Sequence, residues 1–187
     1  MIPSIQACFD LMAEYRMLDN IRAHSLLVAK VARLIAQGLY DTGVDIDVKK
    51  VIAAALLHDI GKTPALKWGG DHAVMGADIC RNHHLDEIAP IVLEHVRLRH
   101  YDLNGTYSEK EVVYYSDKRV NHDQIVGLDD RLAYILNRYG TKGSRLNQAI
   151  RANFGLCKQV QAKLFKKLNF TPEALAQEAA NAGEIPA

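Results

Sequence analysis

The sequence predicts an all-α protein, and three observations support this prediction. Apolar residues recur at spacings of three and four along most of the 187 residues, which is the period of an amphipathic helix. The connecting segments are short and rich in Asp, Asn, Ser and Gly, which commonly begin or end helices. Strand-like alternation is rare, and no repeat or low-complexity tract is present. Because the length suits one domain with a good-sized core, we expect a single domain over residues 1–187.

Five helices are expected in the first half of the chain. Their apolar patterns cover residues 3–18, about 20–38 and about 47–58, and two further segments that begin near residues 71 and 86. Side chains that can accept the free N–H groups of a first helical turn stand before four of them: Asp19 or Asn20, Asp45 or Asp47, Asp71 and Asp86. The proline and glycines of residues 63–71 predict a loop between the third and fourth helices.

The second half of the chain continues the helical pattern. The helix that begins near residue 86 reaches about residue 98, and the polar segment 99–107 predicts an exposed loop. A helix follows from about Ser108, and three more are expected near 128–139, 144–168 and 171–181. We therefore expect a C-terminal helical extension over residues 128–181.

Composition limits the classes of partner. The formal net charge of +1 gives no broad basic field, so we expect neither a nucleic-acid partner nor a membrane surface. Three cysteines without a CxxC pair indicate a reducing compartment. Charged residues interrupt the N-terminal apolar pattern, and no apolar run approaches the roughly 18 residues that a bilayer span needs. These features predict a cytoplasmic protein.

Histidine and aspartate on inward-facing helix positions are the unusual feature of the sequence. A single histidine on an apolar face is more often a hydrogen-bonded core residue than a metal ligand. Five helices that each place such a residue inward are harder to explain by packing, because buried ionisable groups cost several kcal/mol unless they are compensated. A metal ion would compensate them together. The candidates are His24, His58 with Asp59, His72, His95 and Asp117.

Three of these segments resemble a known signature. His24 in IRAHSLLVAKVA, the His58-Asp59 pair in AALLHDIGK and Asp117 in VVYYSDKRV resemble the H…HD…D signature of the HD superfamily of metal-dependent phosphohydrolases, and HDIGK resembles its HDIG subset. The resemblance covers residues 20–121. It implies a helical bundle with a metal site in its middle, at which these four residues bind one ion.

The resemblance also implies a second ion. Many members of the superfamily add two histidines before the last Asp, with the aspartate of the HD pair bridging the ions, and His72 and His95 stand where those histidines would fall. This arrangement is similar to the dinucleoside tetraphosphate hydrolase branch, although Val96-Arg97 replaces its Thr-rich stretch. The GYP signature of the cyclic-dinucleotide branch is absent. If only one ion is bound, the two added histidines become phosphate contacts or a general acid.

The residue types favour hydrolysis at phosphorus. Imidazole and carboxylate ligands suit Fe, Mn, Co, Ni or Zn, which lower the pKa of bound water, and two ions can clamp the attacking and leaving oxygens. We expect Asp59 to be catalytic as the bridge, and Lys62 to orient it or reach a phosphate oxygen. Arg97 and Lys118 could bind substrate phosphate, or could be a solvated side chain and a surface ion pair. His122 follows Asp117 by five residues and is expected to point away.

The predicted function is a metal-dependent phosphohydrolase that cleaves a phosphate ester or anhydride of a nucleotide or related small molecule. The alternative is a metal-loaded regulatory module that binds a nucleotide without turnover. Trp68 could stack on a base or plug the helix ends. The basic residues of the C-terminal third could close over substrate or pack a homodimer, and these are Arg131, Arg138, Lys142 and Arg145.

Overall fold

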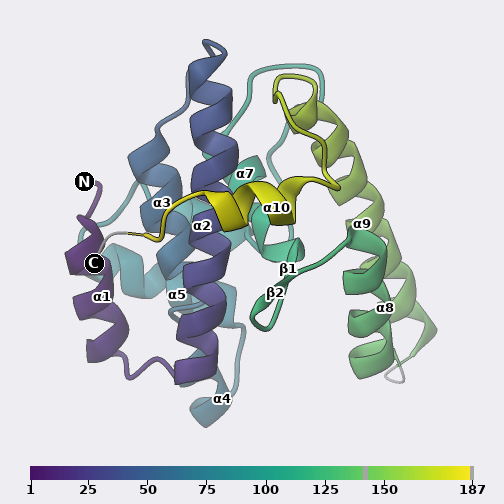
Figure 1. Cartoon of the computed structure of the whole chain (residues 1–187). Helices are drawn as coiled ribbons and strands as arrows, with labels where there is room; N and C mark the ends of the chain where they lie inside the picture. The colour runs from purple at the N-terminus through teal and green to yellow at the C-terminus, as the bar shows by residue number, and fades with distance from the viewer. Residues whose placement is uncertain (141–142, 186–187) are drawn as a thin grey trace.

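The computed structural model describes residues 1–140 and 143–185, and this part of the chain is almost entirely helical (Figure 1). Its only strands, β1 (Val120–Asn121) and β2 (Gln124–Ile125), form an antiparallel hairpin in which Val120 pairs with Ile125. The all-α prediction is therefore confirmed. The described helices are α1 (Ile5–Glu14), α2 (Asp19–Asp41), α3 (Val48–Leu57), α4 (Lys62–Trp68), α5 (His72–Asn82), α6 (Ala89–Glu94), α7 (Glu109–Lys118), α8 (Leu128–Tyr139), α9 (Ser144–Phe165) and α10 (Leu175–Asn181).

Helix α2 is the centre of the bundle. It packs against α3 and α7, and these two helices also contact each other, so their apolar faces form one core. Helix α1 covers α3, α5 pairs with α6, and α10 crosses the outside of α2. Helices α8 and α9 lie side by side and join the rest through α7 and the hairpin (Figure 1). The ends of α3, α6 and α7 consequently meet in the interior.

Helix starts follow the predicted caps in several places. The Asp47 carboxylate accepts the N–H of Lys50, and the Asp71 carboxylate accepts the N–H of Ala73. Ser108 forms a capping box with Glu111 at the start of α7, and these side chains satisfy N–H groups that have no partner inside the helix. Helix α8 has its predicted bounds, whereas α1, α9 and α10 are shorter than predicted.

The predicted loop over residues 63–71 is wrong, because residues 62–68 form α4. Pro64 lies in the first turn of this helix, where its missing N–H removes no intrahelical hydrogen bond. The helix ends at Gly69, whose φ of 78° is accessible to glycine at little cost. The Asp19 or Asn20 cap is also wrong: α2 begins at Asp19, and the preceding Leu18 donates its N–H to the Thr63 hydroxyl of α4.

The predicted helix over residues 86–98 is reduced to α6, and Asp86 does not cap it. The buried Glu94 carboxylate accepts the backbone N–H groups of Arg99 and His100, which turns the chain immediately after the helix. Within the described residues no helix has the length and apolar character to cross a bilayer.

Candidate metal centre

Two histidines occupy equivalent positions at the ends of helices. His58 directly follows α3 and His95 directly follows α6, and each ring nitrogen Nδ1 donates to the carbonyl three residues earlier, at 2.7 Å from Ala55 O and 2.6 Å from Val92 O. Carbonyls in a last turn have no partner within the helix. Because a carbonyl oxygen can only accept, the proton is on Nδ1, and a neutral ring presents the lone pair of Nε2 to the interior.

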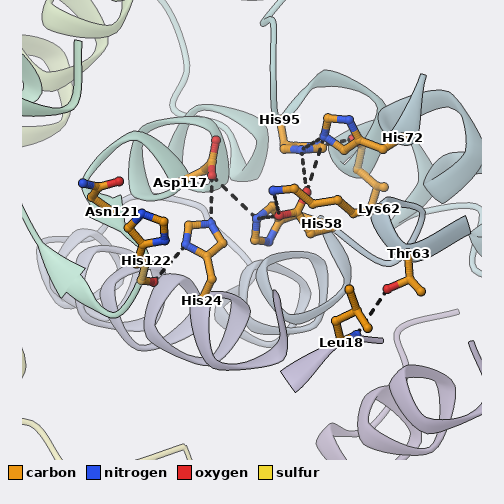
Figure 2. A network of polar contacts seen from close by, with 12 residues as sticks. Leu18, His24, His58, Lys62, Thr63, His72, His95, Asp117, Asn121 and His122 are labelled. Atoms are coloured by element: carbon orange, nitrogen blue, oxygen red, sulfur yellow. Dashed lines mark hydrogen bonds and ion pairs between the residues drawn. The ribbon is translucent and has the colours of Figure 1, made fainter. Parts of the chain in front are cut away.

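His24 reaches the same arrangement from the middle of α2. Its Nδ1 donates over 3.3 Å to the backbone carbonyl of His122, in the turn of the β1–β2 hairpin, so Nε2 again faces inward (Figure 2). His122 adopts a positive φ of 56° in that turn. The expectation that His122 takes no part is corrected here, because its main chain, not its ring, contacts the cluster.

The inward nitrogens face carboxylate oxygens. His24 Nε2 lies 3.2 Å and His58 Nε2 3.6 Å from Asp117 Oδ1, and His58 Nε2 lies 3.5 Å from Asp59 Oδ2. On the other side of Asp59, Oδ1 is 3.4 Å from His72 Nε2 and 3.6 Å from His95 Nε2. An unprotonated imidazole nitrogen and a carboxylate oxygen both accept, so such contacts are favourable only with a cation between them.

His58 gives this conclusion its strongest support. Its side chain is completely buried, and burial lowers the pKa of the imidazole to about 3, so the ring is neutral at pH 7. Among the described residues, its buried Nε2 has no hydrogen-bond partner. An unpaired buried acceptor costs about 1–3 kcal/mol, and a metal ion beside Asp59 and Asp117 would remove that cost.

Both carboxylates are ionised. Burial disfavours the charged form of Asp59, but the Lys62 ammonium, 2.8 Å from its Oδ2, favours that form, and the pKa of Asp59 lies well below its ordinary value. Burial likewise opposes ionisation of Asp117, and the Lys118 ammonium beside it holds its pKa well below the ordinary value. The centre therefore combines neutral nitrogen and anionic oxygen donors, which suits a divalent transition metal.

The donor atoms divide into two groups that share one residue. His24, His58 and Asp59 offer atoms within 4.8 Å of one another, and so do Asp59, His72 and His95. Asp117 joins the first group through its contacts with both histidines. The structure thus brings all six predicted ligands together, with Asp59 between two clusters.

The two lysines near the centre differ in what they can reach. Lys62 Nζ bonds Asp59 Oδ2 at 2.8 Å, and its side chain is 42% exposed toward the cavities above the cluster. Lys118 is buried, and its ammonium bonds the His95 carbonyl at 2.6 Å and Asp117 Oδ2 at 3.2 Å. Lys118 therefore holds two candidate ligands in place, which corrects both the prediction of a phosphate contact and its alternative, a surface ion pair.

The glycine of the HDIGK segment permits a close approach of two elements. A Cβ on Gly61 would lie 2.3 Å from the carbonyl oxygen of His72 and 2.4 Å from the N of Gly76, both of them backbone atoms. A Cβ on Gly76 would lie 2.9 Å from Val92 Cγ1. The two glycines allow α5 to pack on the HD segment and on α6, and this packing brings His72 to Asp59.

Two cavities open onto the cluster, and α8 forms a wall of each. The larger, of about 710 Å³, lies over Asp59, His72, His95 and Asp117. The smaller, of about 150 Å³, lies over His24 and His122. The C-terminal third thus covers the centre. The sequence had left two roles open for this part of the chain, closing over substrate or packing a homodimer.

Several other candidate residues lie elsewhere. Arg97 is exposed and lines neither of these two cavities, so its contact with substrate stays a prediction. Trp68 is 70% exposed and so is not a plug over the helix ends. Arg131 and Arg138 of α8 line the cavities instead, and Lys142 lies outside the described residues.

Among known proteins, the chain is similar to relatives whose names refer to RNA. The chain is 37% identical over 99 residues to ribonuclease Y of Mycoplasma mycoides, and 41% identical over 84 residues to ribonuclease Y of Mycoplasma capricolum. It is also 41% identical over 96 residues to a tRNA (cytidine(56)-2'-O)-methyltransferase of Thermoplasma volcanium. These matches cover 53%, 45% and 51% of this chain but only 22%, 15% and 26% of the relatives. No solved structure matches the chain.

These relatives overturn the predicted partner. The sequence predicted a small-molecule nucleotide substrate and no nucleic acid, whereas the names of these relatives refer to RNA. Net charge misled because it averages the whole chain, while phosphate recognition needs only a few cations beside the centre.

The family model provides the assignment. The model of the HD domain matches residues 21–135, which include every candidate ligand. HD domains bind divalent metals, and the two donor groups of this structure fit such an ion. The family and the donor set together support a metal-dependent hydrolase, and the chain belongs to the HD domain family.

Proposed function

We propose that this protein hydrolyses phosphodiester bonds of RNA with one or two divalent transition-metal ions held at the HD centre. The observation that carries the proposal is the buried, unpaired Nε2 of His58, which faces two ionised carboxylates. The similarity to ribonuclease Y supports RNA as the substrate class.

Each candidate ligand has a place in this proposal. His24, His58, Asp59 and Asp117 would hold one ion, and Asp59, His72 and His95 a second, with Asp59 as the bridge. When bound, such ions lower the pKa of water and stabilise charge on phosphate oxygens. The backbone carbonyls that accept from Nδ1 of His24, His58 and His95 keep these rings in the orientation that binding requires.

Asp59 and Lys62 are the two side chains proposed to take part in catalysis. Asp59 is almost fully buried, so its carboxylate is fixed between the two donor groups. Lys62 holds Asp59 Oδ2, and its partly exposed ammonium can approach a nonbridging phosphate oxygen from the cavity. Attack of water on phosphorus breaks one P–O ester bond, and the leaving oxygen takes a proton.

The test combines metal analysis with RNA cleavage. Protein purified without chelator is expected to contain Mn, Fe, Co, Ni or Zn, and to cut a labelled single-stranded RNA when one of these ions is supplied. Asp59→Asn should lower kcat by at least about 10³-fold and release most of the metal, because it changes both donor groups. The matched control is Asp129→Asn, whose side chain is 79% exposed on α8.

The number of ions follows from two further variants in the same assay. His24→Ala should remove the ion of one donor group and His72→Ala that of the other, so each lowers the metal content by about one equivalent if two ions bind. Metal-loaded protein that binds RNA but cuts none with any of these ions would contradict the proposal.

A further inference from the structure

The two cavities over the cluster share one wall. Four residues line both of them: Lys62, Arg131, Ile135 and Tyr139. Beyond this shared part the cavities diverge, one over His24 and His122 and the other over His72 and His95. The space above the candidate centre therefore continues on both sides of it, beneath one face of α8.

The smaller cavity is the basic and polar side. Arg138 lines only the smaller cavity. Arg131 lines both cavities and so lies where they meet. Arg131 bonds Asn121 Oδ1 at 2.6 Å, and Arg138 bonds the Tyr134 hydroxyl at 3.2 Å. These contacts use one or two N–H groups of each guanidinium, which has five, so others remain to bind phosphate.

The larger cavity also has apolar side chains in its lining. Leu66, Val96 and Leu146 line it and are 70%, 41% and 38% exposed, and Ile150 lies beside them. Large apolar side chains that stay exposed around a cavity are suited to contact a ligand with an apolar face. A nucleobase has such a face, and apolar contact with it depends little on the base identity.

Part of this wall lies outside the region that the family model matches. The family model ends at residue 135, so Arg138, Leu146 and Ile150 lie beyond it. The candidate ligands all lie within it. Arg131, Leu66 and Val96 also lie within it, so both parts of the chain line the cavities.

We propose that the two cavities form one groove for a single-stranded RNA chain that passes through the centre. Arg131 contacts the phosphate at the centre, and Arg138 contacts the next phosphate on the His24 side. The base on the other side of the centre packs against Leu66, Val96 and Leu146. The inference rests on the proposed function, and it requires a substrate that extends on both sides of the bond that is cut.

Two substrates and two binding-site variants test the groove. We would compare a labelled single-stranded RNA of about twelve nucleotides with a dinucleotide that has one phosphodiester bond. Arg138→Gln should lower kcat/KM for the longer RNA about tenfold, because a charge-assisted hydrogen bond to phosphate is lost, and this loss should be at least fivefold larger than the loss on the dinucleotide. Leu66→Asn should lower kcat/KM for both substrates, since each has a base on that side.

Matched controls have the same chemistry outside the groove. Arg151→Gln changes an exposed arginine of α9, and Val74→Asn changes an exposed apolar residue of α5; neither residue lines these two cavities. In a second measurement, RNA binding is followed by fluorescence anisotropy in the Asp59→Asn background. There Arg138→Gln should reduce the slope of log K against log salt by about 0.7, as expected for one phosphate contact on a single strand.

The outcomes separate this inference from the proposed function. If the protein cuts RNA and Arg138→Gln behaves like Arg151→Gln on both substrates and in the salt slope, the groove is overturned while the function stands. If RNA is not cut with any ion but binding still depends on Arg138 and Leu66, the groove stands and the function fails. Equal loss on both substrates with an unchanged salt slope would also overturn the groove.

Discussion

At the scale of single residues, the centre depends on groups that fix side chains in place. His58 and His95 each use a carbonyl at a helix end to hold the ring, and His24 uses the carbonyl of His122. These hydrogen bonds determine which nitrogen carries the proton, and so leave Nε2 of each ring free for a metal ion. Three parts of the chain far apart in sequence therefore present the same donor atom to one place.

Gly61 gives a prediction at this scale. Gly61→Ala should destabilise the fold by about 1–3 kcal/mol, because the added Cβ would overlap the backbone of His72 and Gly76 and force α5 away. Since His72 moves with α5, the variant should also bind less metal. Thermal unfolding and metal analysis check the two effects.

Gly155→Ala is the matched control for this change. Gly155 lies inside α9, and a Cβ there would meet no atom within 4 Å. Its replacement should stabilise the protein by about 0.5–1 kcal/mol, through helix propensity alone. If Gly61→Ala were as stable as the wild type and bound metal fully, the close packing of α5 on the HD segment would not be needed.

At the scale of elements, α9 is tied to α7 by a buried ion pair. The Lys163 ammonium bonds both oxygens of Glu111 at 2.8 and 2.9 Å, and it also bonds the carbonyls of Asp102 and Thr106. Both charged side chains are almost fully buried. This cluster fastens the 99–107 segment and holds α9, which forms part of the groove, against the helix that carries Asp117.

Lys163→Met should therefore destabilise the protein by about 3 kcal/mol, because it leaves the Glu111 carboxylate buried and unpaired. For a chain of this size the corresponding fall in Tm is roughly 6–12 °C. Lys166→Met is the control, since Lys166 is an exposed residue that directly follows the last residue of α9. A loss below about 1 kcal/mol would mean that water or another group replaces the pair.

At the scale of the whole molecule, the centre lies where α2, α3, α5, α6 and α7 converge. Donor groups from these separate elements face one another at 3.2–3.6 Å. A bound cation would thus link most of the bundle. Metal binding is expected to stabilise the global fold and not only the local site.

Metal addition tests this expectation. At a free concentration of about 1,000 times Kd, a suitable ion should add about 4 kcal/mol to the free energy of unfolding, which raises Tm by roughly 8–16 °C. A strong chelator should reverse the change. Mg²⁺ is the control, because it prefers oxygen ligands and should stabilise much less than Mn²⁺ or Co²⁺. An unchanged Tm with every transition-metal ion would contradict binding at the centre.

The sequence by itself determined the helical class and the inward faces that carry the candidate ligands. Both follow from spacing, since residues three and four apart share a helix face, and a histidine in an apolar stripe must enter the core with it. The caps at Asp47, Asp71 and Ser108 were also readable, because a first turn needs acceptors from its immediate neighbours.

Only the tertiary structure decided how those residues are held and what covers them. The carbonyl of His122 reaches His24 from 98 residues away, and Glu94 ends α6 by binding N–H groups of the following loop. The groove likewise joins α4 to α8, and it places Arg131 and Arg138 over the centre while Arg97 faces solvent. Such contacts depend on how whole elements pack, and local periodicity contains no information about the distance between two faces.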